Sequence, residues 1–335
     1  MTDYAFLSGT GFTTVDFVIE VWELTTLTSV GSAVAPPFAS VIQAPGAVRI
    51  NHAGTKLYVT NGQVGGSAGG LLGVFDLPAL TFNTWIDLSS VCTGAVGIAI
   101  DSSDTYAYVT GMVTGSVTQV DLASNAVVGN CTGFSADPTF GIAGVTVDAG
   151  GAYVYLVDPA PGNMVQIDTS TMTVVASVNT FGLGDQTAID IEPAGGNLWV
   201  GAFTQVPLPL TGAANFYPGP ASESYYPGAV KLNHAGTKAY LITDSAPQFW
   251  EINTSTFTLH GPTALSGDLT DIAITPSNGH AVVAVASGGF QIFLIDLTTY
   301  AVVPASSGIV ASTYGAAIGN YNPSPPPSSQ IVMLL

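Results

Sequence analysis

The sequence predicts an all-β protein that folds as a single seven-bladed β-propeller, and three observations predict it. A short apolar strand that ends in a polar residue recurs seven times along the 335 residues. The ends of consecutive copies lie 41 to 50 residues apart, which is the period of a four-stranded propeller blade. No long stretch shows the 3.6-residue periodicity of an amphipathic helix. The seven copies are Val48–Asn51, Ile98–Asp101, Val145–Asp148, Ile189–Glu192, Val230–Asn233, Ile272–Thr275 and Ala317–Asn320.

The remaining strands of each blade follow the first at regular offsets. A tight turn comes next, as at 51–54, where Gly and Asn or Asp supply the backbone conformation of a hairpin. Seven residues after the first strand ends, six blades place Tyr58, Tyr108, Tyr155, Trp199, Tyr240 and Val282. A third strand then ends in an apolar residue followed by Asp or Asn, as at Phe75-Asp76 and Ile252-Asn253. Ser and Thr lead into a fourth strand, such as Thr173–Ala176. The repeated aromatic type predicts that one packing site is filled in blade after blade.

In two blades the motif resembles the YVTN family of β-propeller repeats, known from microbial surface-layer and other extracellular proteins. The resemblance lies in Leu57–Asn61, in Tyr108–Thr110 and in Gly115–Asp121, and it is looser over the rest of the chain. It implies the propeller fold and a tendency toward surface display, and it carries over no catalytic residues. Because seven-bladed folds also include sugar lactonases, the fold does not separate an enzyme from a binding module.

The N-terminal residues complete the ring. Tyr4–Gly9 matches the second-strand pattern of Tyr106–Gly111, and Val21–Thr26 matches a third-strand ending. The first residues therefore predict strands two to four of a closing blade whose first strand, Ala317–Asn320, comes from the far end of the chain. Pairing the two ends removes sheet edges that would otherwise stay open.

Two segments divide the chain: the propeller over residues 1–320 and a Pro-rich spacer with an apolar tail over 321–335. Polyproline forms a semi-rigid spacer, and exposed apolar side chains forgo their burial energy. We expect the tail to dock as a strand on the closing blade, with a neighbouring subunit as the second choice. The assembly residues of this tail are Ile331, Val332, Met333, Leu334 and Leu335.

The charge balance restricts the partners. Lys and Arg number 4 against 22 Asp and Glu, giving a formal net charge of -18. Such a surface repels phosphate and anionic lipid within a Debye length, so we expect no nucleic-acid partner. No apolar run approaches the roughly 20 residues of a membrane-spanning helix, so we expect no membrane insertion. Other proteins of a surface assembly or glycans are the expected partners, within a larger oligomer.

Cys92 and Cys131 each stand in a Cys-Thr-Gly triplet at the ends of neighbouring repeats. A disulfide between them is possible, but spacing alone does not supply the geometry of a bridge. Two separate buried thiols are the favoured interpretation.

Blade four departs from the repeat after Trp199-Val200. Residues 202–228 lack the acidic strand ending and are rich in proline and aromatic residues. Proline cannot donate to a sheet ladder, so the segment predicts an edge or an irregular flap. Its rings either seal the side of the blade or bind a protein or glycan. The candidate binding residues are Phe216, Tyr217, Tyr225 and Tyr226.

A glycine-rich loop at 62–70 forms a second departure, in blade one. It shares a predicted face of the ring with 134–140, 181–186 and the start of the blade-four flap, and this is the preferred binding face. The loop by itself is better explained as a flexible connector.

The chemistry of known catalytic sites is missing from the sequence. His52 and His234 occupy equivalent hairpin turns, and equivalent places in a ring point apart, so we interpret them as turn residues. No zinc, phosphate-loop or EF-hand motif is present. We therefore expect no catalytic residue, no metal ligand and no cofactor. The remaining alternative is a structural calcium or catalytic metal at acids of the channel mouth, which are Asp185, Asp190, Glu192 and Asp271.

These observations predict a non-enzymatic structural module on the exterior of a virion or a microbial surface layer. It would bind protein or glycan through one face of the propeller. The chain shows no basic start followed by an apolar stretch, so we expect no Sec signal peptide, which suits a virion surface better than a secreted cell-surface protein. The alternative function is a lactonase-type, metal-dependent hydrolase with its site at the channel mouth.

Overall fold

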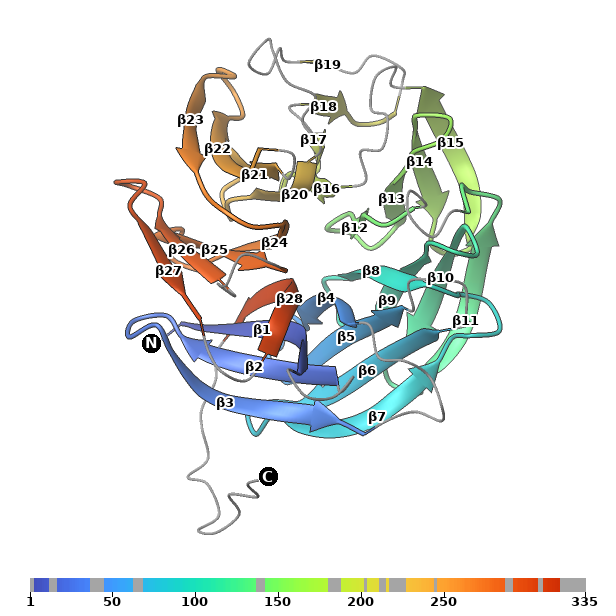
Figure 1. The fold of residues 1–335 in the computed structure, drawn as a ribbon. Helices are drawn as coiled ribbons and strands as arrows, with labels where there is room; N and C mark the ends of the chain where they lie inside the picture. The colour runs from blue at the N-terminus through green and yellow to red at the C-terminus, as the bar shows by residue number, and fades with distance from the viewer. Residues whose placement is uncertain are drawn as a thin grey trace.

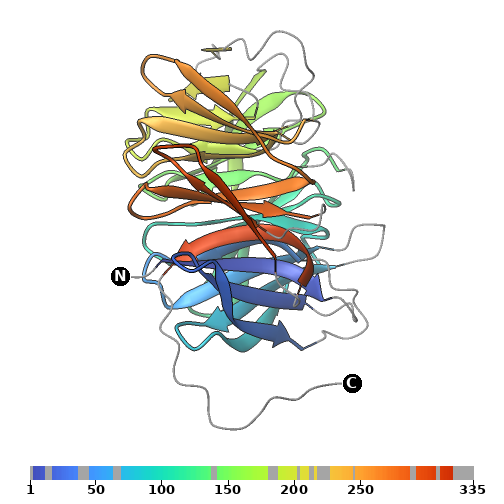
Figure 2. The ribbon, with the colours of Figure 1, turned by 60° about the vertical axis from the view of Figure 1, so that its left-hand side comes forward.

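A computed structural model shows the chain as a closed ring of seven four-stranded antiparallel sheets (Figures 1 and 2). The structure describes residues 3–11, 17–36, 45–62, 69–136, 142–179, 188–201, 204–210, 215–216, 227–243, 246–286, 292–306 and 310–319. Within these ranges there is no helix. The first strand of every blade lies nearest the centre of the ring and contacts the first strands of both neighbours. The predicted seven-bladed fold is therefore confirmed.

The blades follow one another in chain order. Blade 1 contains β4 (Pro45–Ile50), β5 (Lys56–Gly62), β6 (Gly70–Asp76) and β7 (Thr81–Asp87). Blade 2 contains β8 (Ala95–Ile100), β9 (Tyr106–Gly111), β10 (Ser116–Asp121) and β11 (Ala126–Thr132). Blade 3 contains β12 (Val145–Val147), β13 (Tyr153–Asp158), β14 (Asn163–Asp168) and β15 (Thr173–Asn179). Blade 4 contains β16 (Ile189–Ile191), β17 (Asn197–Val200), β18 (Thr204–Pro207) and β19 (Asn215–Phe216). Blade 5 contains β20 (Pro227–Leu232), β21 (Lys238–Thr243), β22 (Gln248–Asn253) and β23 (Leu259–Ala264). Blade 6 contains β24 (Leu269–Ile274), β25 (His280–Val285), β26 (Ile292–Asp296) and β27 (Val302–Ala305).

The closing blade joins the two ends of the chain as predicted. Its strand order is β28 (Val310–Gly319), β1 (Tyr4–Gly11), β2 (Phe17–Glu23) and β3 (Thr28–Ala35). Phe6 pairs with Ala317 here as Tyr58 pairs with Arg49 in blade 1. Gly319 therefore occupies the position that Asn51 has in blade 1. The repeat of the closing blade ends at Gly319, one residue before the predicted end at Asn320. The residue at this turn position is Gly319, whereas the other blades have a polar residue there, so the polar pattern places the strand one residue too late.

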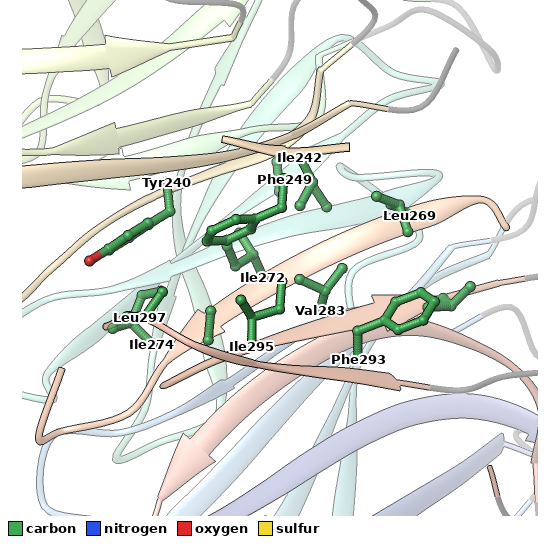
Figure 3. Close-up of a cluster of buried hydrophobic side chains, with 13 residues drawn as sticks. Tyr240, Ile242, Phe249, Leu269, Ile272, Ile274, Val283, Phe293, Ile295 and Leu297 are labelled. Carbon is green, nitrogen blue, oxygen red and sulfur yellow. The ribbon is translucent and has the colours of Figure 1, made fainter. Parts of the chain in front are cut away.

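Seven apolar clusters fill the spaces between neighbouring blades. The repeated position contributes one side chain to each cluster, and that side chain is buried against the following blade in each case. Figure 3 shows one such cluster, where Tyr240 and Phe249 of blade 5 meet Ile272 and Ile295 of blade 6. Residues of this position are Phe6, Tyr58, Tyr108, Tyr155, Trp199, Tyr240 and Val282. The predicted packing site is thus confirmed. Each blade buries the side chain at this position against the next blade, and the burial of apolar surface favours the contact.

Polar side chains hold the hairpin turns that follow the inner strands. The Asn51 side chain accepts hydrogen bonds from the backbone N–H groups of Thr55 and Lys56, and Asp101 does the same for Thr105 and Tyr106. Gly54 adopts φ +68°, a conformation that disfavours any side chain. Short-range sequence chemistry therefore shapes these turns.

Side-chain hydroxyl groups on second strands form hydrogen bonds to backbone carbonyl groups of the next blade. Thr60 donates to the Val96 carbonyl of blade 2 at 2.8 Å, and Ser8 donates to the Gly46 carbonyl of blade 1 at 2.7 Å. A Cβ on Gly97 would lie 1.8 Å from the Ala143 carbonyl oxygen, so glycine permits the close approach of blades 2 and 3. No helix among the described residues is long and apolar enough to cross a membrane.

Candidate interaction surface

The predicted aromatic flap lies mostly outside the described residues. Phe216 belongs to the two-residue strand β19, which pairs with β18 through Thr204. Tyr217, Tyr225 and Tyr226 fall outside the described ranges, as do the tail residues 331–335. The shortness of β18 and β19 agrees with the predicted departure of blade 4 from the repeat. The choice between sealing and recognition by these rings stays a prediction.

The acids predicted at the channel mouth hold neighbouring blades together. Asp190 of β16 accepts the Leu232 N–H of β20 at 2.9 Å and lies 3.3 Å from Lys231 Nζ. Asp271 of β24 accepts the Ala316 N–H of β28 at 3.1 Å and lies 3.4 Å from Arg49 NH1. Both carboxylates therefore bridge inner strands of different blades.

Glu192 has a local role, and Asp185 falls outside the described residues. The Glu192 carboxylate accepts the Asn197 side-chain amide at 2.7 Å and the Trp199 indole N–H at 3.1 Å. Among the described residues, no group of three or more His, Cys, Asp and Glu side chains is arranged to hold a metal ion. The structure thus brings Asp190 and Asp271 to cations, whereas the partners of Glu192 lie within its own blade, on β17 and β18.

Every basic residue of the chain is engaged by a carboxylate. The pairs are Arg49–Asp271, Lys56–Asp76, Lys231–Asp190 and Lys238–Glu251. Arg49 and Lys56 in blade 1 occupy the same repeat positions as Lys231 and Lys238 in blade 5. Because each cation already has an anionic partner, the surface keeps the negative field that its net charge implies.

The histidines contact neighbouring elements in the described structure. His52 Nδ1 lies 3.0 Å from Asp104 of blade 2, and His234 Nδ1 lies 2.9 Å from Asn278 of blade 6. The His260 ring stacks on Tyr300 with a centroid separation of 3.9 Å. His52 and His234 are thus turn residues, as predicted, and they also bridge adjacent blades, which the sequence did not indicate.

The two cysteines are separate free thiols, and the favoured prediction is confirmed. Cys92 packs in the cluster between blades 1 and 2, whereas Cys131 packs in the cluster between blades 2 and 3. Burial raises the pKa of the Cys92 thiol to about 12, and it also raises the pKa of Cys131. Both thiols are therefore poor nucleophiles at neutral pH.

The exposed large apolar side chains of the described residues gather on the outermost strands. We call them the valine rim, and all lie on β3, β11, β15 or β27 at the periphery of the ring (Figure 1). Their exposed fractions run from 37% to 54%. The members of the rim are Val30, Val34, Val127, Val128, Val174, Val175 and Val303.

A β-bulge places part of the rim at equivalent positions. In blade 2, Gln119 pairs with Gly129 and Val120 with Val127, so Val128 is the extra residue. By the same pairing pattern, Val175 is the unpaired bulge residue in blade 3 and Val30 is the unpaired bulge residue in the closing blade. A bulge turns a residue out of the alternation of the strand, which explains why two successive valines are exposed in β11 and in β15.

These peripheral strands carry almost no charge. Among the residues of β3, β7, β11, β15, β19, β23 and β27, the only Asp, Glu, Lys or Arg is Asp87. Soluble proteins commonly protect open strand edges with charged side chains, Lys above all. Only one of the 22 acidic residues of the chain therefore lies on these described outer strands. The sequence signal for this surface is the set of valine doublets at Val127-Val128, Val174-Val175 and Val302-Val303, which was not used to predict it.

Comparison with known proteins identifies the fold. No known family model matches the chain, and no curated protein matches its sequence significantly. A functionally unknown protein from Desulfotomaculum acetoxidans matches with TM-score 0.67 and 13% identity over 91% of this chain and 96% of its own. Hydrazine synthase from Kuenenia stuttgartiensis matches with TM-score 0.63 and 13% identity over 78% and 80%. The Cps50 (Swd1) β-propeller domain of Myceliophteria thermophila matches with TM-score 0.60 and 11% identity over 77% and 84%.

The chain has the fold of a seven-bladed β-propeller. At these identities the similarity concerns the fold alone. The finer resemblance to YVTN repeats continues to rest on the residues of blades 1 and 2.

Proposed function

We propose that this propeller is a non-enzymatic interaction module on the exterior of a large assembly, a virion or a microbial surface layer. The valine rim carries the proposal. Seven half-exposed valines on uncharged strand edges form a surface that suits burial against other protein subunits. The faces of the ring then stay available for a protein or glycan partner.

The charge distribution supports the same role. Acidic turn residues lie at the two ends of the strands, while the rim between them lacks charge. Lateral contact through the rim keeps like charges of neighbouring subunits apart, whereas face-to-face contact would oppose them. This arrangement favours packing side by side in a layer or shell.

The hydrolase alternative has weaker support in the geometry. Asp190 and Asp271 would have to release Lys231 and Arg49 before they could hold a catalytic metal. Isothermal titration of the purified chain with calcium or zinc discriminates the two functions. Stoichiometric binding that Asp190→Asn or Asp271→Asn abolishes would favour the hydrolase.

Charge substitution in the rim tests the proposed function. The double variant Val128→Glu and Val175→Glu should fold and melt like wild type, because both side chains are about half exposed (54% and 52%). It should be lost from purified particles or envelopes of the source, which the wild-type chain should join. Ala149→Glu adds a charge at an exposed hairpin turn away from the rim and is the matched control. Recovery of the double variant at the wild-type level would reject the rim as an assembly surface.

A further inference from the structure

The outer edge of β3 is an open edge in the closing blade. β3 pairs with β2 and with no other strand among the described residues. Its eight residues, Thr28–Ala35, contain no charge and no proline, and Val30 and Val34 are exposed. An edge of this kind is a template for one more strand.

The C-terminal strand β28 ends in the same row of the blade in which β3 begins. Gly319 of β28 pairs with Tyr4, Tyr4 pairs with Glu23, and Glu23 pairs with Thr28. These four residues therefore form one row across the blade, from its inner strand to its outer strand. Gly319, the last residue of β28, therefore lies at the end of the blade where β3 begins.

The following residues are long enough to reach the open edge. Three strand spacings of about 4.8 Å separate β28 from β3, which is about 14 Å. Residues 320–330 can span about 34 Å at the rise of about 3.1 Å per residue of polyproline II. A strand that began there would run in the same direction as β3. An antiparallel strand would have to start at the other end of β3, about 26 Å further along the blade. Residues 320–330 would then have almost no length to spare.

The chemistry of the segment matches the edge. Residues 320–335 contain no charged side chain, and Ile331–Leu335 is a run of five large apolar residues. Apolar side chains gain free energy when they leave water, and a neutral edge imposes no charge that must be desolvated with them.

We propose that Ile331–Leu335 binds the outer edge of β3 in its own chain as a parallel fifth strand of the closing blade. The strand would cover Val30 and Val34 and leave the rim of blades 2 and 3 free. This inference concerns the isolated monomer. It takes Val30 and Val34 out of the rim and leaves the other five valines for the proposed function.

Engineered disulfides test the contact directly. The native thiols, Cys92 and Cys131, are buried and should not compete. Under mild oxidation, the full-length variant Val34→Cys with Leu335→Cys should form a disulfide within the monomer. The matched control, Val175→Cys with Leu335→Cys, has nearly the same exposure at its rim position (52% against 54%) and should stay reduced.

Thermal melting of the monomer gives the second measurement. Removal of residues 321–335 should lower the melting temperature by about 2–6 °C. A full-length variant with Ile331→Ser, Val332→Ser and Leu334→Ser should show the same loss, because it keeps the length and removes the apolar side chains. Unchanged melting in both variants would overturn the proposal. Disulfides that join two chains would assign the segment to a second copy, and equal oxidation of both cysteine pairs would show no preferred edge; either result also overturns it.

Discussion

His52 of blade 1 and Asp104 of blade 2 join two neighbouring hairpin turns through one carboxylate. Asp104 accepts the His52 backbone N–H at 2.7 Å and the Ala53 N–H at 2.8 Å, and His52 Nδ1 lies 3.0 Å away. The equivalent turns of blades 5 and 6 use Asn278 in place of the aspartate, at 3.1 Å from the His234 N–H. The ring therefore contains a titratable and a non-titratable version of one contact.

This pair predicts a pH-dependent share of stability. Burial of the Asp104 carboxylate raises its pKa, but the N–H groups of His52 and Ala53 outweigh burial and hold the pKa below its usual value. A lowered folded-state pKa means that the contribution is complete above the unfolded pKa of about 3.9 and is lost as pH falls through the folded pKa. Asp104→Asn should therefore be less stable than wild type at pH 7, by about 1 kcal/mol, and the difference should shrink in acid.

Urea unfolding between pH 7 and pH 3 measures this effect. Asn278→Asp is the reciprocal control and should gain an acid-dependent contribution at the other pair of turns. A constant difference between wild type and Asp104→Asn over the whole range would contradict the prediction.

The burial of Glu20 predicts that an apolar residue at this position would stabilise the fold. Its side chain is 0% exposed, and neither carboxylate oxygen has a hydrogen-bond partner among the residues that the structure describes. It lies on β2 opposite Leu7 and Ser32. Burial of a polar group without a partner costs about 1–3 kcal/mol in proteins. Glu20→Leu should raise the free energy of unfolding by an amount of that order.

Thermal and urea denaturation measure the change. Glu23→Leu is the matched control, because the Glu23 carboxylate accepts the Thr26 hydroxyl at 2.9 Å in an exposed turn and should give no gain. A lower melting temperature for Glu20→Leu than for wild type would show that Glu20 has a partner in solution.

The hydrogen bonds of Thr110 predict that removing its hydroxyl would destabilise the junction of blades 2 and 3. Its hydroxyl accepts the Gly97 N–H at 2.9 Å and donates to the Ala143 carbonyl at 2.7 Å. Thr110→Val keeps the shape but leaves both backbone groups without this partner, so it should cost about 1–3 kcal/mol. In equilibrium unfolding, the stability of Thr110→Ser, which retains the hydroxyl, should lie between those of Thr110→Val and wild type. Equal stability of Thr110→Val and wild type would remove this hydroxyl from the contacts that join the blades.

The thiols predict a chemical test of the packing. Both cysteines are buried on opposite sides of blade 2, and burial raises their pKa values. A thiol reagent at pH 8 should react with neither cysteine in the folded chain and with both after denaturation. Fast labelling of the native protein would mean that blade 2 opens readily toward its neighbours.

The sequence by itself determined the number of blades, the order of strands and the closure. The reason is that hairpin turns and strand alternation are local. Asn51 and Asp101 bond to N–H groups four and five residues away, so their positions reveal the turns directly. The repeated aromatic position could be found because every blade presents the same neighbour to it. The closing strand was misplaced by one residue where Gly319 breaks the polar pattern.

Tertiary structure decided which residues meet between blades and which remain uncovered. Arg49 and Asp271 are 222 residues apart in sequence and become partners because the ring closes between them. Val128 and Val175 are exposed because bulges turn them outward, and Cys92 and Cys131 are separated because the sheet of blade 2 lies between their clusters. Such outcomes depend on the pairing register and on the adjacent blade, which the period of the sequence does not specify.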